Sequence, residues 1–204
     1  MFNLPYCIMK TISQTLLIYC LITISFYSIA QEVSTFTDPR DEQEYKIVDL
    51  KIALEAGIFI HRTWMAENLN FKSQGSTCYK NYDAYCEKFG RLYTWDAANT
   101  ACPEGWHLST QREWNEVLDT FGGKYVAGKA LKEGGESNLN IIMAGFSDAV
   151  GNFSDVGKTA HLWDAENKDT KTAGLISLYE KYDEVAHDQI KSGNMNSCRC
   201  VQDY

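Results

Sequence analysis

The chain has few basic residues for its size. Its 204 residues include 19 Lys and Arg against 27 Asp and Glu, which gives a formal net charge of −8. Proteins that bind nucleic acid or an anionic membrane surface need a basic face. The composition therefore argues against both kinds of partner and is typical of a solvated acidic surface. The chain also lacks internal repeats and low-complexity tracts, which indicates an ordinary globular domain.

Histidine is scarce as well, with four residues in the whole chain. These are His61, His107, His161 and His187, and no two of them are three or four residues apart. The usual ligand spacing of a zinc site is therefore missing. His107 stands between two apolar residues, and we expect it to be packed in the core or at its edge. The sequence predicts no metal and no cofactor.

Calcium is the one alternative that the pattern of acidic residues leaves open. Several side chains in the second half of the chain offer the hard oxygen ligands that calcium prefers. They are Asp148, Asp155, Asp164, Glu166, Asn167 and Asp169. Their spacing fits no EF-hand, so we expect solvated loop carboxylates rather than a calcium site.

A long apolar run is found at the N-terminus. Lys10 precedes residues 16–29, and Ser28-Ile29-Ala30 ends the run on small residues, as in a secretory signal peptide. The run is short for a membrane span and is interrupted by Thr23 and Ser25. We therefore expect residues 1–30 to be a signal peptide, with no stable membrane span after cleavage. The expected location is outside the cell or in the cell envelope, in the periplasm or at the outer surface.

Cleavage after Ala30 would leave 174 residues, enough for one domain with a sizeable core. It removes one Lys and no acidic residue, so the remaining chain carries 18 basic and 27 acidic side chains, a net charge of −9.

Five cysteines follow the predicted cleavage site. They are Cys78, Cys86, Cys102, Cys198 and Cys200. Because the number is odd, at least one of them is unpaired or pairs with another molecule. The most economical arrangement is a local Cys78–Cys86 bridge and a long-range bridge from Cys102 to the C-terminal pair. The spacing alone leaves open whether Cys198 or Cys200 is the partner of Cys102.

The first half of the domain shows clear local patterns. Residues 31–44 are polar and acidic and are expected to form a linker or an N-terminal arm. Residues 45–54 and 57–69 have the residue pattern of two strands, and Gly57 separates the two runs. This pattern predicts a hairpin. Residues 72–90 predict a disulfide-stapled loop, and residues 95–101 a short helix. A longer helix is expected to start at Thr110, because Glu113 completes a capping box and an apolar stripe follows.

The second half alternates short apolar runs with Gly, Asn, Ser and Asp. Gly122-Gly123 ends the longer helix, and a short helical piece is expected near residues 129–131. Short strands are predicted over residues 141–146, 161–163, 173–179 and 199–201. The chain is therefore expected to be a single α+β domain with much irregular structure.

Several motifs in this order resemble the Fibrobacter succinogenes major paralogous domain. They are Trp64-Met65-Ala66-Glu67-Asn68-Leu69-Asn70, the stretch from Gly90 to Trp114 with its Cys102-Pro103-Glu104-Gly105-Trp106 core, Gly145-Phe146 and Arg199-Cys200-Val201. The resemblance covers residues 45–204 and implies that Cys102 pairs with Cys200, which leaves Cys198 as the free thiol. Residues 52–62 depart from the family pattern, because they hold extra sequence where a compact turn is usual.

The family occurs largely in exported proteins of Bacteroidetes and is similar to the formylglycine-generating-enzyme domain. That similarity implies a C-type-lectin-like fold with short strands, two or three helices and long irregular loops. It implies no settled biochemical activity. Formylglycine-generating chemistry needs its own cysteine pair before the Arg-Cys-Val end, and no cysteine lies between Trp163 and Cys198. We therefore expect that the chain is not an enzyme. The alternative is a thiol-dependent enzyme that uses Cys198.

The Cys198-Arg199-Cys200 motif itself allows two kinds of chemistry, soft-metal binding and thiol exchange. Two cysteines alone do not complete a metal site, so further ligands would have to come from elsewhere in the chain. A structural disulfide to Cys200 is the expected role.

Most aromatic residues are expected in the core. The better candidates for a surface that binds ligand are Trp163, Tyr79 and Tyr82, with Asp164 and Glu166 as polar neighbours. The sequence thus predicts an exported, non-catalytic binding or structural module. Its expected ligand is a carbohydrate or a protein of the cell envelope.

Overall fold

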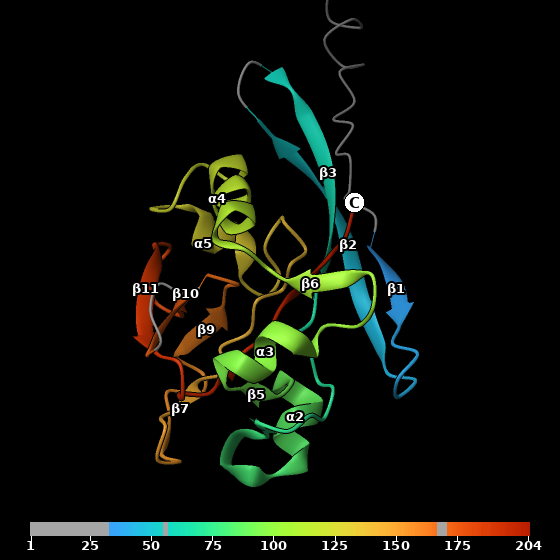
Figure 1. Cartoon of the computed structure of the whole chain (residues 1–204). Coiled ribbons are helices and arrows are strands. Elements are labelled where there is room, and N and C mark those ends of the chain that lie inside the picture. The colour runs from blue at the N-terminus through green and yellow to red at the C-terminus, as the bar shows by residue number, and fades with distance from the viewer. Residues whose placement is uncertain (1–32, 55–56, 167–170) are drawn as a thin grey trace, which may run out of the picture. The chain divides into compact units, whose positions relative to one another are not determined.

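The computed structural model describes residues 33–54, 57–166 and 171–204, and these residues belong to one compact unit (Figure 1). The predicted signal peptide, residues 1–30, lies outside the described residues, as do Asn167 and Asp169 of the calcium hypothesis.

Two sheets carry most of the described strands. The first has the order β1-β2-β3-β13-β6, and the second has the order β11-β10-β9-β12-β5-β4. The strands of the first sheet are β1 Val33–Thr37, β2 Glu44–Ala53, β3 Phe59–Met65, β13 Cys200–Gln202 and β6 Trp106–Leu108. Those of the second are β11 Val185–Lys191, β10 Thr172–Tyr179, β9 Thr159–Trp163, β12 Asn196–Ser197, β5 Leu92–Tyr93 and β4 Ser76–Thr77. A small third sheet pairs β7 Phe146–Ser147 with β8 Phe153–Ser154.

The C-terminal segment joins the two sheets. Strand β12 lies between β9 and β5 in the second sheet, and β13 lies between β3 and β6 in the first. Only Cys198 and Arg199 separate β12 from β13. The chain therefore passes from the interior of one sheet directly into the interior of the other, and the residues at this crossing are buried.

Short helices connect the strands of the described part of the chain. They are the 3₁₀ turn η2 Tyr79–Asn81, α2 Asp83–Phe89, α3 Trp95–Ala101, α4 Gln111–Thr120 and α5 Ala127–Leu131. The capping box that predicts α4 is present, because the Thr110 hydroxyl accepts a hydrogen bond from the Glu113 backbone N–H and the Glu113 carboxylate accepts one from the Thr110 backbone N–H. The structure is thus α+β, as the sequence predicts.

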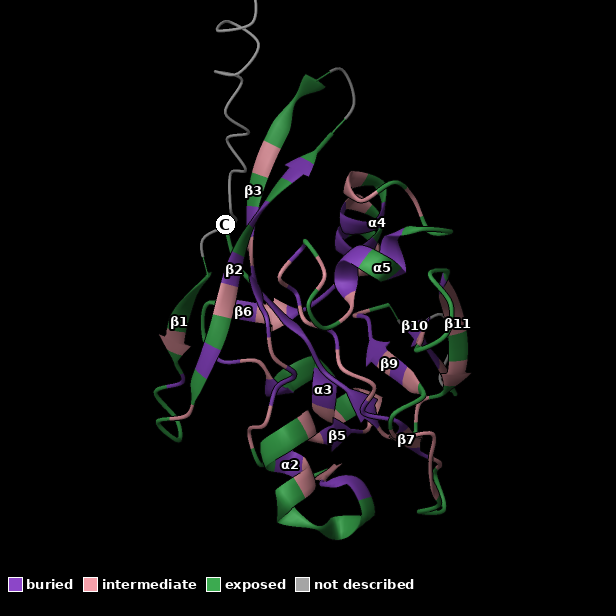
Figure 2. Ribbon diagram, turned by 180° about the vertical axis from the view of Figure 1, so that it is seen from behind, coloured by how far each residue is buried: buried purple, intermediate pink, exposed green. Residues whose placement is uncertain are grey.

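The predicted hairpin over residues 45–69 is confirmed by the pairing of β2 with β3, from Ile47 opposite Met65 to Ala53 opposite Phe59. Along β2 buried and exposed side chains alternate, which is the pattern of a strand that covers a core on one face (Figure 2). Residues 52–54 and 57–62 form the outer part of this hairpin, which projects from the body of the domain (Figure 1). Ile58 and Phe59 near the tip are 58% and 52% exposed.

Several segments differ from expectation. The described part of the predicted linker or arm forms β1, which pairs with β2 in register from Val33 opposite Val48, because its Thr and Phe residues suit a sheet edge. The stapled loop contains α2, a seven-residue helix too short to show a clear period. Only Ile141 and Gly145 of the predicted strand before β7 form isolated bridges, since Asn140 and Gly145 have positive φ angles of 48° and 67°. Strand β11 has little apolar alternation and leaves no clear strand signal in the sequence.

Two groups of buried side chains form the core. One fills the space between the β2–β3 hairpin, α4 and β10, and its centre is the contact of Trp64 with Trp114, whose ring centroids are 4.5 Å apart. The other surrounds Tyr93, Trp163 and the C-terminal cysteines. These groups hold the backbone around the candidate sites in place.

Candidate functional site

Four of the described cysteines form two disulfides. Cys78 pairs with Cys86 and Cys102 pairs with Cys200, across sequence separations of 8 and 98 residues. Cys198 is the free cysteine and is fully buried. This is the arrangement that the resemblance implies, with Cys200 rather than Cys198 as the partner of Cys102.

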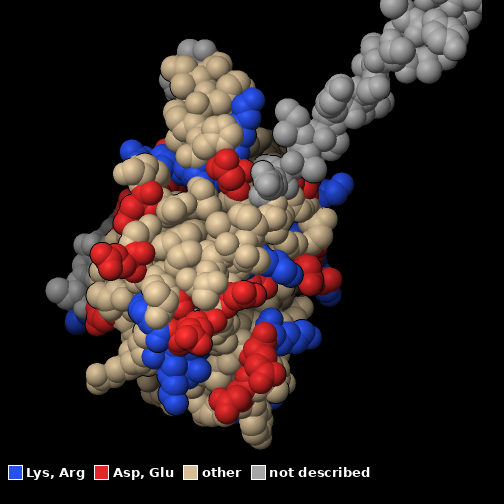
Figure 3. Space-filling model, turned by 90° about the vertical axis from the view of Figure 1, so that its right-hand side faces the viewer, with Lys and Arg blue, Asp and Glu red and all other residues tan. Residues whose placement is uncertain are grey.

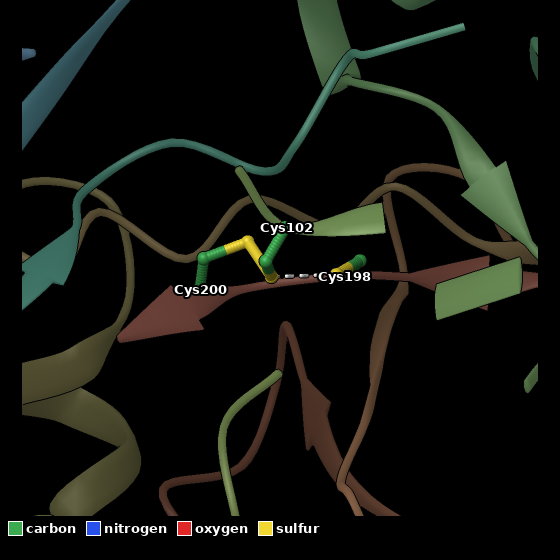
Figure 4. A group of neighbouring side chains, drawn as sticks. All are labelled: Cys102, Cys198 and Cys200. Carbon is green, nitrogen blue, oxygen red and sulfur yellow. Dashed lines mark hydrogen bonds between the residues drawn. A yellow bond between two sulfur atoms is a disulfide. The ribbon is translucent and has the colours of Figure 1, made fainter. Parts of the chain in front are cut away.

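Cys102, Cys198 and Cys200 lie together (Figure 4). Cys102 follows the last residue of α3, and Cys198 and Cys200 flank Arg199 at the crossing between the sheets. The Sγ atoms of Cys102 and Cys198 are 3.9 Å apart, and the three sulfur atoms all lie within 4.8 Å of one another. Burial raises the pKa of Cys198 to about 12, so its thiol is protonated at neutral pH.

Arg199 is fully buried beside this cluster and binds three separate segments. Its Nη1 donates to the carbonyl oxygens of Met65 at 2.9 Å and Leu139 at 2.6 Å, and its Nη2 donates to Asn68 Oδ1 at 2.9 Å. Burial lowers the pKa of the guanidinium, and the negative potential of Glu67 opposes this shift. Because its partners are mostly backbone carbonyls, Arg199 acts as a structural cross-link between loops.

The predicted ligand surface does not exist in the expected form. Trp163 has no exposed surface, and its Nε1 donates to the Tyr93 carbonyl oxygen at 2.7 Å. The prediction was wrong because Trp163 points into the buried cluster around Tyr93, which a pattern of neighbouring residues does not reveal. Tyr79 is also buried, between Tyr85 and Phe153, with ring centroids 5.3 and 5.2 Å away.

The polar residues predicted beside that surface do not form a common site either. Asp164 is 1% exposed, and its Oδ1 accepts a hydrogen bond from the Glu166 backbone N–H at 2.8 Å, which shapes the turn after β9. Glu166 and Tyr82 are exposed but belong to different parts of the chain. Asp148 of the calcium hypothesis also has a local role, because it accepts hydrogen bonds from the backbone N–H groups of Val150 and Asn152.

A polar hollow of about 480 Å³ lies elsewhere, between the start of β2, the segment after β3 and the end of α2. Most of the residues that line it are charged or carry amides. The polar ones are Gln43, Glu44, Lys46, Glu67, Asn68, Asn70, Glu87, Lys88, Glu133 and Asn140. Interspersed acidic and basic side chains are also found over the lower half of the face seen in Figure 3.

Hydrogen bonds fix the walls of the polar hollow. Glu67 Oε2 accepts from the Lys46 backbone N–H at 2.8 Å, and Asn70 Nδ2 donates to Gln43 Oε1 at 3.2 Å. Asn68 lies at the base, where its Nδ2 donates to the Phe89 carbonyl oxygen at 3.0 Å. Asn70 Oδ1 is buried and has no hydrogen-bond partner among the residues that the structure describes. The hollow therefore offers a fixed set of donors and acceptors, one of which is unsatisfied.

A second polar group joins α4 to the C-terminus. His107 Nδ1 is 2.6 Å from Asp203 Oδ1, and its Nε2 is 3.0 Å from Glu113 Oε1. The Tyr204 hydroxyl donates to Glu113 at 2.6 Å, and the Arg62 guanidinium lies 4.4 Å from the centroid of the Tyr204 ring. The expectation that His107 is packed at an edge missed these partners; the capping-box role of Glu113 was the only signal in the sequence that pointed to them.

This group predicts how stability depends on pH. Burial opposes ionisation of Glu113, but hydrogen bonds from His107, Tyr204 and Thr110 outweigh it and lower the carboxyl pKa to about 2. The stability from Glu113 is present above its unfolded pKa of 4.5 and is lost as the pH falls from about 4.5 to 2, by about 3 kcal/mol in total. The hydrogen bond with Glu113 raises the pKa of His107, so stability also falls as the pH rises through that raised pKa.

Urea unfolding at a series of pH values between 2 and 9 measures this dependence. Glu113→Gln should reduce the loss of unfolding free energy between about pH 4.5 and 2. Glu104→Gln on the surface should leave that loss unchanged. If Glu113→Gln and the unmodified chain lose the same free energy of unfolding in acid, Glu113 is not the group responsible.

The comparisons with known proteins give the class of the chain. The sequence pattern of the Fibrobacter succinogenes major domain matches residues 61–202, which contain both disulfides and most of the two sheets. The chain belongs to this family. Searches of curated proteins and of solved structures found no match. Within the described residues, no helix is long and apolar enough to cross a membrane.

Proposed function

We propose that the chain is an exported, non-catalytic binding module that binds a carbohydrate of the cell envelope in the polar hollow. The observation that carries the proposal is the hollow itself. Its volume of about 480 Å³ lies within the range of roughly 300–1,000 Å³ that is typical of ligand sites. The hollow replaces the predicted surface around Trp163, which is buried.

The chemistry of the walls favours a ligand rich in hydroxyl groups. Each sugar hydroxyl both donates and accepts, and a side-chain amide also does both. Gln43, Asn70 and Asn140 supply amides at the hollow, and Glu87 and Lys88 add an acceptor and a donor at its rim. Asn70 and Gln43 are hydrogen-bonded to each other at the hollow, and we assign this pair of amides to the ligand hydroxyls.

The state of the free cysteine supports a non-catalytic role. A thiol-dependent enzyme needs an accessible thiolate. Cys198 has no exposed surface, and its pKa of about 12 keeps it protonated at neutral pH. Its burial disfavours the alternative of an enzyme related to the formylglycine-generating family.

Export and the finer fold type belong to the same proposal. Two disulfides in one small domain are typical of proteins that fold in an oxidising compartment, which supports secretion to the envelope. We assign the α+β architecture to the C-type-lectin-like type, because short strands and short helices alternate with long loops and the C-terminal strand lies inside the domain.

Glycan-array screening followed by calorimetric titration tests the binding site. We expect Asn70→Ala and Glu87→Ala to weaken binding of the selected glycan at least tenfold, about 1.4 kcal/mol each. Glu104→Ala, an exposed substitution outside the hollow, is the control and should leave the Kd unchanged. Equal affinities for all the variants, or no glycan bound by the unmodified chain, would overturn the proposal.

A further inference from the structure

The cluster of Cys102, Cys198 and Cys200 holds more sulfur than a structural disulfide needs. Cys102 and Cys200 form the bond, and Cys198 places a third sulfur 3.9 Å from Cys102 Sγ. The three sulfur atoms come from two distant segments that the sheets hold in place, and all lie within 4.8 Å of one another. Two cysteines of the Cys198-Arg199-Cys200 motif are thus supplemented by a third from the end of α3.

The distance between the sulfur atoms of Cys102 and Cys198 matches that in a metal site of three thiolates. With metal–sulfur distances of about 2.3 Å, a trigonal site places its sulfur atoms about 4.0 Å apart. The Cys102–Cys198 separation already has this value. Cleavage of the Cys102–Cys200 bond would let its two sulfurs separate to the same spacing, because unbonded sulfur atoms repel each other at closer range.

We propose that Cys102, Cys198 and Cys200 form a copper(I) site when the Cys102–Cys200 disulfide is reduced. The reductant is a dithiol. One of its thiolates attacks the sulfur of Cys102, the least buried residue of the three, and releases Cys200 as a thiolate, which takes up the proton that the dithiol has lost. Its second thiolate then resolves the mixed disulfide, so that the dithiol is oxidised and Cys102 and Cys200 are reduced by two electrons. Copper(I) then replaces the three thiol protons, which leave to solvent.

The ligand set selects among soft metals. Thiolates favour copper(I) and zinc, but structural zinc requires four ligands. The metal-ligating group found among the described residues consists of these three cysteines alone. Three thiolates complete the coordination of copper(I) and leave zinc one ligand short. The burial of Cys198 and Cys200 keeps water away from the bound ion.

A chain that keeps only these three cysteines provides the test. Cys7, Cys20, Cys78 and Cys86 are replaced by Ser in the full chain, and a phosphine reduces the remaining disulfide without adding thiols. Copper(I) is then offered in competition with bicinchoninate, whose copper complex is coloured. We expect the reduced chain to withdraw one copper(I) per molecule and the oxidised chain to withdraw none. Cys198→Ser in the same chain should lower the copper affinity at least 100-fold.

Thermal unfolding separates a folded site from binding by an unfolded chain. Copper(I) should raise the Tm of the reduced three-cysteine chain, because it binds the folded state. The same addition should leave the Tm of the Cys198→Ser chain nearly unchanged. The proposal is overturned if the two chains withdraw copper equally, if the reduced chain withdraws none, or if copper neither raises the Tm nor refolds a chain that reduction has unfolded.

Discussion

Replacement of Cys102 by Ser is expected to lower the free energy of unfolding by about 4–5 kcal/mol. The disulfide to Cys200 closes a loop with a sequence separation of 98 residues, and a loop of this length restricts the unfolded chain strongly. The bond also ties the end of α3 to the crossing between the two sheets. Urea unfolding monitored by tryptophan fluorescence measures the loss.

Two companion variants make this expectation specific. Cys78→Ser removes the local disulfide, which closes a loop with a separation of only 8 residues, and should cost about 2–3 kcal/mol. Cys200→Ser leaves Cys198 near Cys102, so a replacement disulfide should form between them. Mass spectrometry should detect this disulfide. The loss of unfolding free energy should then be smaller than that of Cys102→Ser. A loss below about 1 kcal/mol for Cys102→Ser would contradict the central role of the long-range bond.

Replacement of Trp114 by Ala is expected to cost about 3–5 kcal/mol. Trp114 has no exposed surface and packs on Trp64 where α4 contacts the β2–β3 hairpin. Its loss leaves a cavity that the two sheets and α4 cannot close. Neither indole nitrogen has a hydrogen-bond partner in the part of the chain that the structure describes, so Trp114→Phe should cost much less than Trp114→Ala.

Tyr125→Ala is the matched control, because Tyr125 follows α4 and is 67% exposed. It should change the free energy of unfolding by no more than about 0.5 kcal/mol. Equal losses for Trp114→Ala and Tyr125→Ala, measured by chemical unfolding, would be inconsistent with a core centred on this tryptophan pair.

Local signals in the sequence predicted much of the fold. The capping box of Thr110 and Glu113 located α4, and the alternation on either side of Gly57 located the hairpin. The family motifs indicated the partner of Cys102. These features depend on residues close in sequence or on a pattern shared by the family, and neither requires knowledge of the sheet order.

The candidate site could not be predicted in the same way. Trp163 is buried because its indole packs in the core cluster with Tyr93 and donates to the Tyr93 carbonyl oxygen, a long-range contact that no local pattern encodes. The polar hollow is formed by segments near residues 43–46, 66–70, 86–90 and 133–142, which the two sheets bring together. Polar residues such as Asn70 and Glu87 resemble ordinary surface positions in the sequence, and only their shared hollow distinguishes them.

Backbone amide shifts during a titration test the proposed ligand site most directly. We expect a glycan selected on the array to shift the amide signals of residues 43–46, 67–70 and 87–90, with Asn70 among the strongest. Signals near Tyr82 and Glu166, on the surface that the sequence predicted, should stay in place. Shifts confined to residues outside the polar hollow would show that the glycan does not bind there.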